Sequence, residues 1–230
     1  MNSYMKKYKK KFNMFKVIIG KDDPIILEVG AHFGEDSLRF IEAFPKATIH
    51  CFEPDPRCVE VFKKYVNNPR IHLHEIALSN VNGELEFFQS FNESEDQVPE
   101  KYDWISEEDY INLKLGNSGS SSLKKGYDKI LSESIKVEAI RYEDWAVKNN
   151  IVEVDLLWID VQGAEKDVLD GMAGSIENVR FIWIEFGELQ YEDALSREET
   201  VEHISNKGFK LIDHFSSKGE AGDLLFMRNK

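Results

Sequence analysis

Residues 25–34, which read IILEVGAHFG, decide the fold class of this 230-residue chain. The first half of the stretch is mostly apolar and rich in β-branched residues, which predicts a strand. Gly30 and Gly34 then bracket a turn, where the lack of a Cβ lets the backbone bend sharply and approach a ligand. Residues 36–44 follow with apolar side chains at helical spacing. The stretch therefore reads as the strand–turn–helix unit of an α/β fold.

The alternation of apolar β-type runs and amphipathic stretches continues along the chain, as is typical of successive βα units that build a mostly parallel sheet. We expect further strands at residues 48–52, 71–76, 84–88, 135–140, 155–160, 179–186, 209–213 and 223–227. Further helices are expected at residues 54–66, 142–149, 165–172 and 198–206. Nearly continuous apolar runs at 155–161 and 179–186 indicate central strands covered on both faces. The last strand follows its neighbour through a glycine-containing loop and is expected to be antiparallel.

The composition fits one globular domain, since 42% of the residues are hydrophobic and 31% are charged. Residues 89–123 interrupt the alternation with many acids and few apolar residues. We expect an insertion there, either an active-site lid or a solvated surface excursion. No run approaches the roughly 18 apolar residues of a membrane span, which predicts a soluble protein. The domain is therefore expected at residues 25–230, preceded by an arm at residues 1–24.

Charge is distributed unevenly, with 29 basic and 42 acidic residues and a net charge of −13. Residues 1–20 hold six lysines and no acid, so a basic arm, expected as a helix along the domain, precedes an acidic body. The negative body disfavours nucleic acid as a partner. Cys51 and Cys58 are the two cysteines, in no metal or redox spacing, which favours free thiols and a cytoplasmic location. The sequence leaves the oligomeric state open.

Ligands of open α/β sheets bind beyond the carboxyl ends of the strands. His32 stands two residues after Gly30, where a dinucleotide fingerprint has glycine, and this argues against an NAD-dependent oxidoreductase. Glu28 at the strand end would repel phosphate and attract an ammonium or sulfonium cation. Glu53, 25 residues later, stands where an acid accepts hydrogen bonds from ribose hydroxyls. We therefore expect a nucleoside that bears a cation, with its base beside Ala77, Leu78 and Ser79.

These strand ends resemble those of the S-adenosylmethionine (SAM)-dependent methyltransferases, and in particular the FkbM-type family. The stretches that carry the resemblance are 28–34 (EVGAHFG), 52–54 (FEP), 75–79 (EIALS), 120–123 (SSSL) and 157–165 (LWIDVQGAE). The last is the most specific. The similarity covers residues 25–187 and continues less distinctly to the end. The chain departs from the usual family pattern at Glu28 (often Asp), His32 (usually Asn) and Gln162 (usually Glu).

The resemblance implies a Rossmann-like sheet of seven strands with helices on both faces, and SAM as the methyl donor. It implies methyl transfer to a hydroxyl of a small molecule, sugar or glycan acceptor. It places Gly30 and Gly34 at the amino-acid end of SAM, Glu53 at the ribose, and Leu78 and Ser79 near the adenine. Asp160 would face the transferred methyl group. The full set expected to bind the cofactor is Glu28, Gly30, His32, Gly34, Glu53, Ala77, Leu78, Ser79 and Asp160.

Methyl transfer to a hydroxyl needs alignment of the acceptor and removal of a proton. The candidates are three acids at the exits of two central strands: Asp160, Glu165 and Glu185. Close carboxylates raise one another's proton affinity, but Asp160 and Glu185 could instead hold a divalent metal, and both options stay open. Glu165 is equally explained as a first-turn helix acid, and His32 is a weaker candidate. A non-catalytic nucleoside-binding or assembly module is the alternative to an enzyme.

Overall fold

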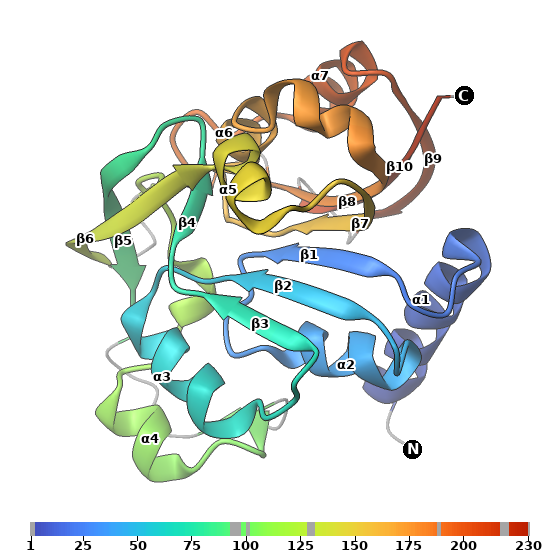
Figure 1. Ribbon diagram of the computed structural model, residues 1–230. Coiled ribbons are helices and arrows are strands. Elements are labelled where there is room, and N and C mark those ends of the chain that lie inside the picture. Colours follow the sequence, from blue (N-terminus) through green and yellow to red (C-terminus); the bar gives the residue numbers. More distant parts are fainter. Residues whose placement is uncertain are drawn as a thin grey trace.

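The structure is a computed structural model that describes residues 3–92, 98–99, 102–127, 132–187, 190–216 and 221–229. Its centre is a seven-stranded sheet with the order β3-β2-β1-β7-β8-β10-β9 (Figure 1). The strands are β1 (Ile25–Val29), β2 (Thr48–Phe52), β3 (Ile71–His74), β7 (Val154–Ile159), β8 (Val179–Gly187), β9 (Phe209–Ser216) and β10 (Ala221–Arg228). Within this sheet β10 pairs antiparallel with β8 and β9, and the other pairs are parallel. The predicted α/β class, strand number and antiparallel last strand are confirmed.

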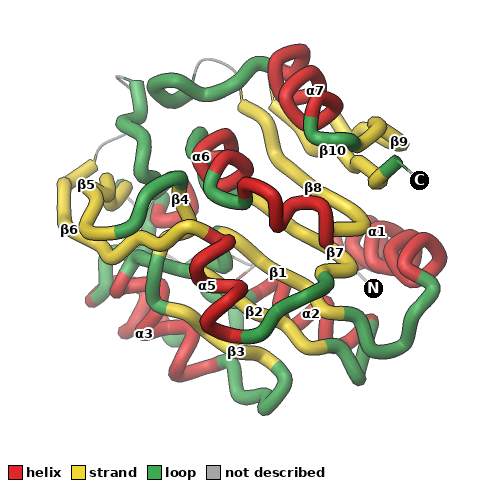
Figure 2. The backbone as a smooth tube through the Cα atoms, turned by 45° about the horizontal axis from the view of Figure 1, so that its top comes forward, coloured by secondary structure: helices red, strands yellow, loops and turns green. Residues whose placement is uncertain are grey.

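Helices cover both faces of the sheet (Figure 2). One face packs against α1 (Ser3–Ile19), α2 (Glu35–Ala43) and α3 (Pro56–Tyr65), and the other against α5 (Tyr142–Asn149), α6 (Glu165–Asp170), η3 (Ala173–Asn178) and α7 (Arg197–Asn206). Successive strand residues alternate between the two cores because side chains of a strand point to opposite faces. Ile26 and Trp158 lie on the α1 side, whereas Leu27 and Ile159 lie on the α5 side.

Helix α3 begins two residues later than its apolar pattern predicts, for a local reason. Asp55 is the N-cap, and its carboxylate accepts a hydrogen bond from the Arg57 N–H (3.0 Å). Pro56 occupies the first turn, where its missing N–H is not needed. The cap leaves Glu53 and Pro54 outside the helix, in the turn that follows β2.

The N-terminal segment is part of the hydrophobic core. Helix α1 buries Phe12, Phe15 and Ile19 against the sheet, and the Phe15 ring lies 5.4 Å from the Trp183 ring, centroid to centroid. The expected helix along the domain is thus observed, but its apolar face is continuous with the core of residues 25–230. Its described basic side chains are those of residues 11 and 16. None of the helices in the described part of the chain is long and apolar enough to cross a membrane.

Three strands form a separate small sheet beside the main one, in the order β4-β6-β5 (Figure 1). They are β4 (Ala77–Ser79), β5 (Gly83–Ser90) and β6 (Ser132–Arg141). The strands predicted at 84–88 and 135–140 exist, but they do not belong to the main sheet. Both have many exposed or half-exposed positions, unlike the fully buried β7, and so are not covered on two faces. β4 follows the strand predicted at 71–76, which ends at His74, and it is a short strand paired in parallel with β6.

Part of the predicted insertion at 89–123 is described. It contains α4 (Glu107–Asn112) and the 3-10 helix η2 (Ser118–Ser120), and it packs on α3 through a cluster that includes Phe33, Tyr102 and Tyr110. Residues 93–97, 100 and 101 of this insertion lie outside the described residues, as do residues 217–220 of the predicted loop before the last strand.

Candidate active site

A cavity of about 300 Å³ lies at the carboxyl ends of β1, β2 and β7. This is where the strand order reverses, the usual ligand position in such sheets. Most of the residues expected to bind the cofactor line it: Glu28, Gly30, His32, Glu53, Ala77, Leu78 and Asp160. Gly34, Ser79, Glu165 and Glu185 are not among the lining residues, and their positions are explained by other contacts described below.

Gly30 fastens the end of β1 to its neighbours. It has φ +83°, and its N–H donates to the Phe52 carbonyl of β2 (3.0 Å). A Cβ on this residue would lie 1.8 Å from the carbonyl oxygen of Asp160. The close approach of two strand ends therefore requires glycine here, in addition to the positive φ.

Gly34 and Ser79 serve packing. Gly34 is the N-cap of α2 with φ +85°, and a Cβ there would lie 2.6 Å from the Phe62 ring of α3. Ser79 is buried in β4, with its carbonyl oxygen 1.9 Å from where a Cβ on Gly171 would be. The proposed contacts of Gly34 and Ser79 with SAM stay predictions, because neither residue lines the cavity.

Glu53 is held in place by backbone donors. Its Oε2 accepts the N–H of His32 (2.7 Å) and its Oε1 accepts the N–H of Asp55 (2.8 Å). The side chain is buried, and burial raises the pKa of the carboxyl to about 7 despite these donors. Glu53 thus presents a carboxyl to the cavity that two backbone donors hold in place.

Glu28 lies deeper. Its Oε2 accepts a short hydrogen bond from the Ser37 hydroxyl of α2 and a weaker one from the Cys51 thiol (3.7 Å). Burial raises the pKa of Glu28 well above its usual range. Because it is both buried and cavity-lining, Glu28 can ionise when a cation binds beside it.

His32 joins the β1 turn to the insertion. It has a left-handed φ of 50°, its Nδ1 lies 3.1 Å from Glu35 Oε1, and its Nε2 lies 2.8 Å from the Ser118 hydroxyl. Both ring nitrogens therefore have partners, while the backbone N–H holds Glu53. This arrangement gives His32 a positioning role, and its proposed part in proton removal stays a prediction.

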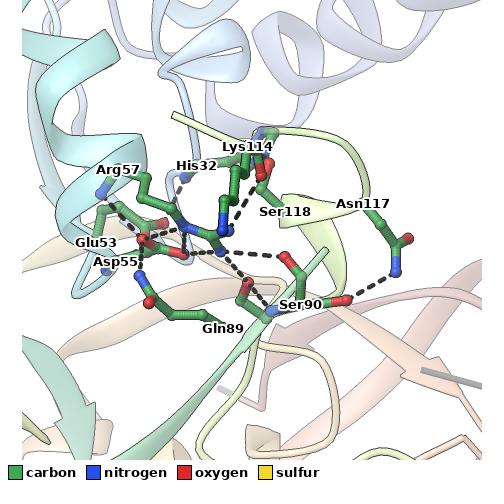
Figure 3. Close-up of polar contacts among 10 residues, drawn as sticks. His32, Glu53, Asp55, Arg57, Gln89, Ser90, Lys114, Asn117 and Ser118 are labelled. Atoms are coloured by element: carbon green, nitrogen blue, oxygen red, sulfur yellow. Dashed lines mark hydrogen bonds and ion pairs between the residues drawn. The ribbon is translucent and has the colours of Figure 1, made fainter. Parts of the chain in front are cut away.

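Arg57 connects the insertion to Asp55, the neighbour of Glu53 (Figure 3). Its guanidinium donates to Asp55 (Nη2–Oδ2, 2.7 Å), to the Ser90 carbonyl (3.1 Å) and to the Lys114 carbonyl (3.1 Å). Asp55 in turn donates its N–H to Glu53. One cation thus connects helix α3, the end of β5 and the segment before η2, and residues 118, 119, 121 and 123 line the cavity from that side.

Two acids lie close together at the ends of β7 and β8, and one of them, Asp160, lines the cavity. Asp160 and Glu185 follow β7 Trp158 and β8 Trp183 by two residues, and the two indole rings are stacked 5.1 Å apart. The Gln162 amide Nε2 donates to Asp160 Oδ1 (2.6 Å) and to Glu185 Oε2 (2.7 Å). Burial, and next the charge of Asp160, raise the pKa of Glu185 well above its usual range. The predicted pairing of these two acids is thus present in space.

The Glu165 carboxyl binds backbone N–H groups of the turn after β7 and does not line the cavity. Its Oε1 accepts the N–H groups of Val161 (3.2 Å) and Gly163 (3.1 Å), and burial raises its pKa to about 7. These contacts shape the turn between β7 and α6, as the reading of a first-turn helix acid implies. A catalytic role for Glu165 stays a prediction that its contacts do not favour.

Sequence reasoning missed the contributions of the helices on the α1 face. Asp36 and Arg39 of α2 form an ion pair (2.6 Å) and line the cavity together with Trp158. Lys11 of α1 places its Nζ 4.2 Å from the Trp158 ring centroid, and burial lowers its pKa while Asp36 raises it. For Trp158 the sequence did hold a signal. Trp158 and Trp183 each stand two residues before an acid, Asp160 and Glu185, and residues two apart lie on the same face of a strand.

Among the described residues, no group of three or more histidine, cysteine and acidic side chains is arranged to hold a metal ion. Asp160 and Glu185 share an amide donor, which fits hydrogen bonding better than coordination. A metal-binding role for Asp160 and Glu185 stays a prediction.

Comparison with known proteins identifies the family. The model of the methyltransferase FkbM domain matches residues 28–211. This chain belongs to the FkbM methyltransferase family. The predicted family and SAM-dependent methyltransferase activity are thereby confirmed.

Two curated relatives agree with this assignment. The 2-O-methyltransferase NoeI of Sinorhizobium fredii is 31% identical over 223 residues, covering 93% of this FkbM methyltransferase and 83% of NoeI. Methyltransferase sdnD of Sordaria araneosa is 27% identical, covering 82% of this chain and 74% of the relative.

Solved structures share the fold. An FkbM methyltransferase from Methylobacillus flagellatus KT superposes with a TM-score of 0.51 at 12% identity, covering 90% of this chain and 44% of that chain. Magnesium protoporphyrin IX methyltransferase from Synechocystis PCC 6803, solved with bound SAM, gives 0.53 at 9% identity, covering 98% and 80%. These likenesses confirm the predicted Rossmann-like methyltransferase architecture.

Proposed function

We propose that this FkbM methyltransferase transfers the methyl group of SAM to a hydroxyl of a carbohydrate or related small molecule. One observation carries the proposal: a single cavity joins the buried acids Glu28 and Glu53 to Asp160. The first two suit a cationic nucleoside, and the third suits a hydroxyl acceptor.

The cofactor end fits SAM by the chemistry of its donors. Glu53 would accept the ribose hydroxyls, since a fixed carboxylate accepts two donors readily. Glu28, through its charge, would favour the positive end of the ligand. Leu78, Phe87 and Leu123 give that part of the cavity apolar walls for a base.

At the acceptor end, Asp160 is the proposed base. SAM supplies a methyl group already activated by the sulfonium centre. The acceptor oxygen forms the new bond to the methyl carbon, the carbon–sulfur electron pair stays on sulfur, and the hydroxyl proton passes to Asp160. The fold contributes alignment of the two reactants and exclusion of water, with Tyr102 and Ser118 on the insertion side.

The acceptor class is inferred from charge and from one relative. Asp36, Asp160 and Gln162 offer oxygen acceptors to a hydroxyl-rich molecule and would repel a phosphate. The net charge of −13 likewise disfavours nucleic acid. NoeI carries the name 2-O-methyltransferase, which supports transfer to oxygen. Cys51 and Cys58 are free and buried, which supports a cytoplasmic location.

Cofactor use is tested by calorimetric titration with SAM, its demethylated product and NAD. We expect the first two to bind and NAD to give no heat. SAM at about 100 times its Kd should raise the free energy of unfolding by about 2.7 kcal/mol. Binding of NAD alone would refute the proposed cofactor.

Catalysis is tested with Asp160→Asn and a panel of mono- and oligosaccharides incubated with methyl-labelled SAM. Loss of the base should lower turnover by about 10²–10⁴-fold and leave the SAM affinity within a few-fold. Asp22→Asn, at an exposed position distant from the cavity, is the matched control. Full turnover in Asp160→Asn would remove Asp160 from the mechanism, and SAM binding with no labelled product from any hydroxyl compound would favour a non-catalytic module.

A further inference from the structure

Gln162 occupies a unique place between the acid pair and the loop that follows β8. Its amide Nε2 donates to both Asp160 and Glu185, and its Oε1 accepts the Tyr191 hydroxyl (3.1 Å). We propose that Gln162 is a positioning residue whose carboxamide, aligned by Tyr191, holds the Asp160 and Glu185 carboxyl groups together at the acceptor end. This inference rests on the proposed O-methyl transfer.

The backbone at Gln162 supports a functional placement. Its φ of 54° lies in the left-handed region, which is uncommon for a residue other than glycine, asparagine or aspartate. Such a conformation persists only where surrounding contacts determine it, and it is concentrated at functional sites. Here the Ser122 hydroxyl donates to the Gln162 carbonyl (2.7 Å), and Glu165 accepts the N–H of Gly163 (3.1 Å).

Tyr191 fixes the direction of the amide. A Cβ on Gly163 would lie 2.5 Å from the Tyr191 Cβ, so glycine is what lets the tyrosine approach the turn. The Tyr191 hydroxyl also donates to the Ser120 carbonyl (2.9 Å) on the insertion side. In this orientation the amide oxygen accepts from a hydroxyl and the amide nitrogen donates to both carboxyl groups.

The Gln162 amide offsets the unfavourable proximity of the Asp160 and Glu185 carboxyl groups. Asp160 and Glu185 approach each other on neighbouring strands, and Asp223 of β10 and Glu165 of α6 add negative charge. Lys11 of α1 supplies positive charge toward Asp160 from the other side. Two N–H donors from one neutral group satisfy an oxygen of each carboxyl without adding a charge.

The decisive variant is Gln162→Glu, which keeps the shape and replaces two donors with an oxygen beside two carboxyls. We expect kcat at about pH 8 to fall by about 100-fold, with partial recovery at about pH 6, where a protonated Glu donates again. The KM for SAM should change by less than about threefold, because the cofactor end is untouched. Gln190→Glu is the matched control, since it adds the same charge at an exposed position one residue from Tyr191.

Tyr191→Phe is the second variant, and it alters no charge. It should lower kcat by about 3- to 10-fold without the acid-shifted pH profile of Gln162→Glu, because only the alignment of the amide is lost. Wild-type kcat and pH profile in Gln162→Glu, or effects of both variants on the KM for SAM alone, would overturn the proposal.

A readout independent of turnover separates this inference from the proposed function. A third buried carboxyl binds its proton more tightly in the folded chain, so stability should fall more steeply with rising pH in Gln162→Glu than in the wild type. Urea unfolding at about pH 5 and about pH 8 measures this difference. An unchanged pH dependence refutes the placement of Gln162 in the pair, whether or not methyl transfer is detected.

Discussion

Replacement of Glu53 by Gln tests the buried carboxyl that faces the nucleoside end of the cavity. The pKa of Glu53 rises from an ordinary 4.5 to about 7, and each pH unit of this difference corresponds to about 1.4 kcal/mol. Ionisation of Glu53 therefore costs the folded state about 3 kcal/mol. The stability contributed by the protonated group is fully present below about pH 4.5 and is lost as the pH rises through about 7.

Glu53→Gln removes this titration but weakens the contacts. Its amide can accept one of the N–H groups of His32 and Asp55, and its NH2 group faces the other, which should destabilise the protein by about 1–3 kcal/mol at about pH 5. Between about pH 5 and about pH 8, the variant should regain about 2–3 kcal/mol relative to the wild type. The stability difference between the two proteins thus shrinks or reverses at the higher pH.

The assay is urea unfolding followed by tryptophan fluorescence, with Glu60→Gln, exposed on α3, as the control for the same change in charge. Other buried acids, such as Glu28 and Glu165, are present in both proteins and cancel in the difference. A stability difference between variant and wild type that is the same at both pH values would refute the reasoning. SAM binding should also weaken by about 10- to 100-fold, since a hydrogen bond to a charged group is lost.

Two further substitutions test the scaffold around the cavity. Gly30→Ala places a Cβ 1.8 Å from the Asp160 carbonyl oxygen. It should prevent folding or lower the melting temperature by more than about 10 °C, which corresponds to a loss of several kcal/mol. Gly174→Ala is its control and should fold normally, because no atom lies within 4 Å of the new Cβ. Phe15→Ala should cost about 3–5 kcal/mol in urea unfolding because the ring is fully buried under α1; Val17→Ala, on the exposed face of the same helix, should stay within about 0.5 kcal/mol. Equal effects of the two members of either pair would contradict the packing described.

The sequence was most informative where the signal is local. An apolar run that ends in Glu28 and Gly30, or in Asp160, predicts both a strand and the chemistry at its exit, because the strand, its turn and the ligand edge of the sheet are adjacent in the chain. The pattern of residues 155–161 and 179–186 similarly placed the two central strands. These features needed no knowledge of distant contacts.

The remaining features depend on direction and on long-range pairing. A position after a strand does not tell whether the residue reaches the ligand cavity, and Gly34 and Ser79, both expected at the cofactor, do not line it. Glu165 curls back to N–H groups only two to four residues away. β4 becomes a strand because it pairs with β6, which lies about 60 residues later in the chain. A stretch of three residues carries no sequence signal for such a distant partner.

The packing of α1 determines which N-terminal truncations of this protein would keep its core covered. Because Phe12 and Phe15 of α1 pack on the indole rings of Trp158 and Trp183, a chain that began at residue 25 would expose these rings to solvent and favour self-association.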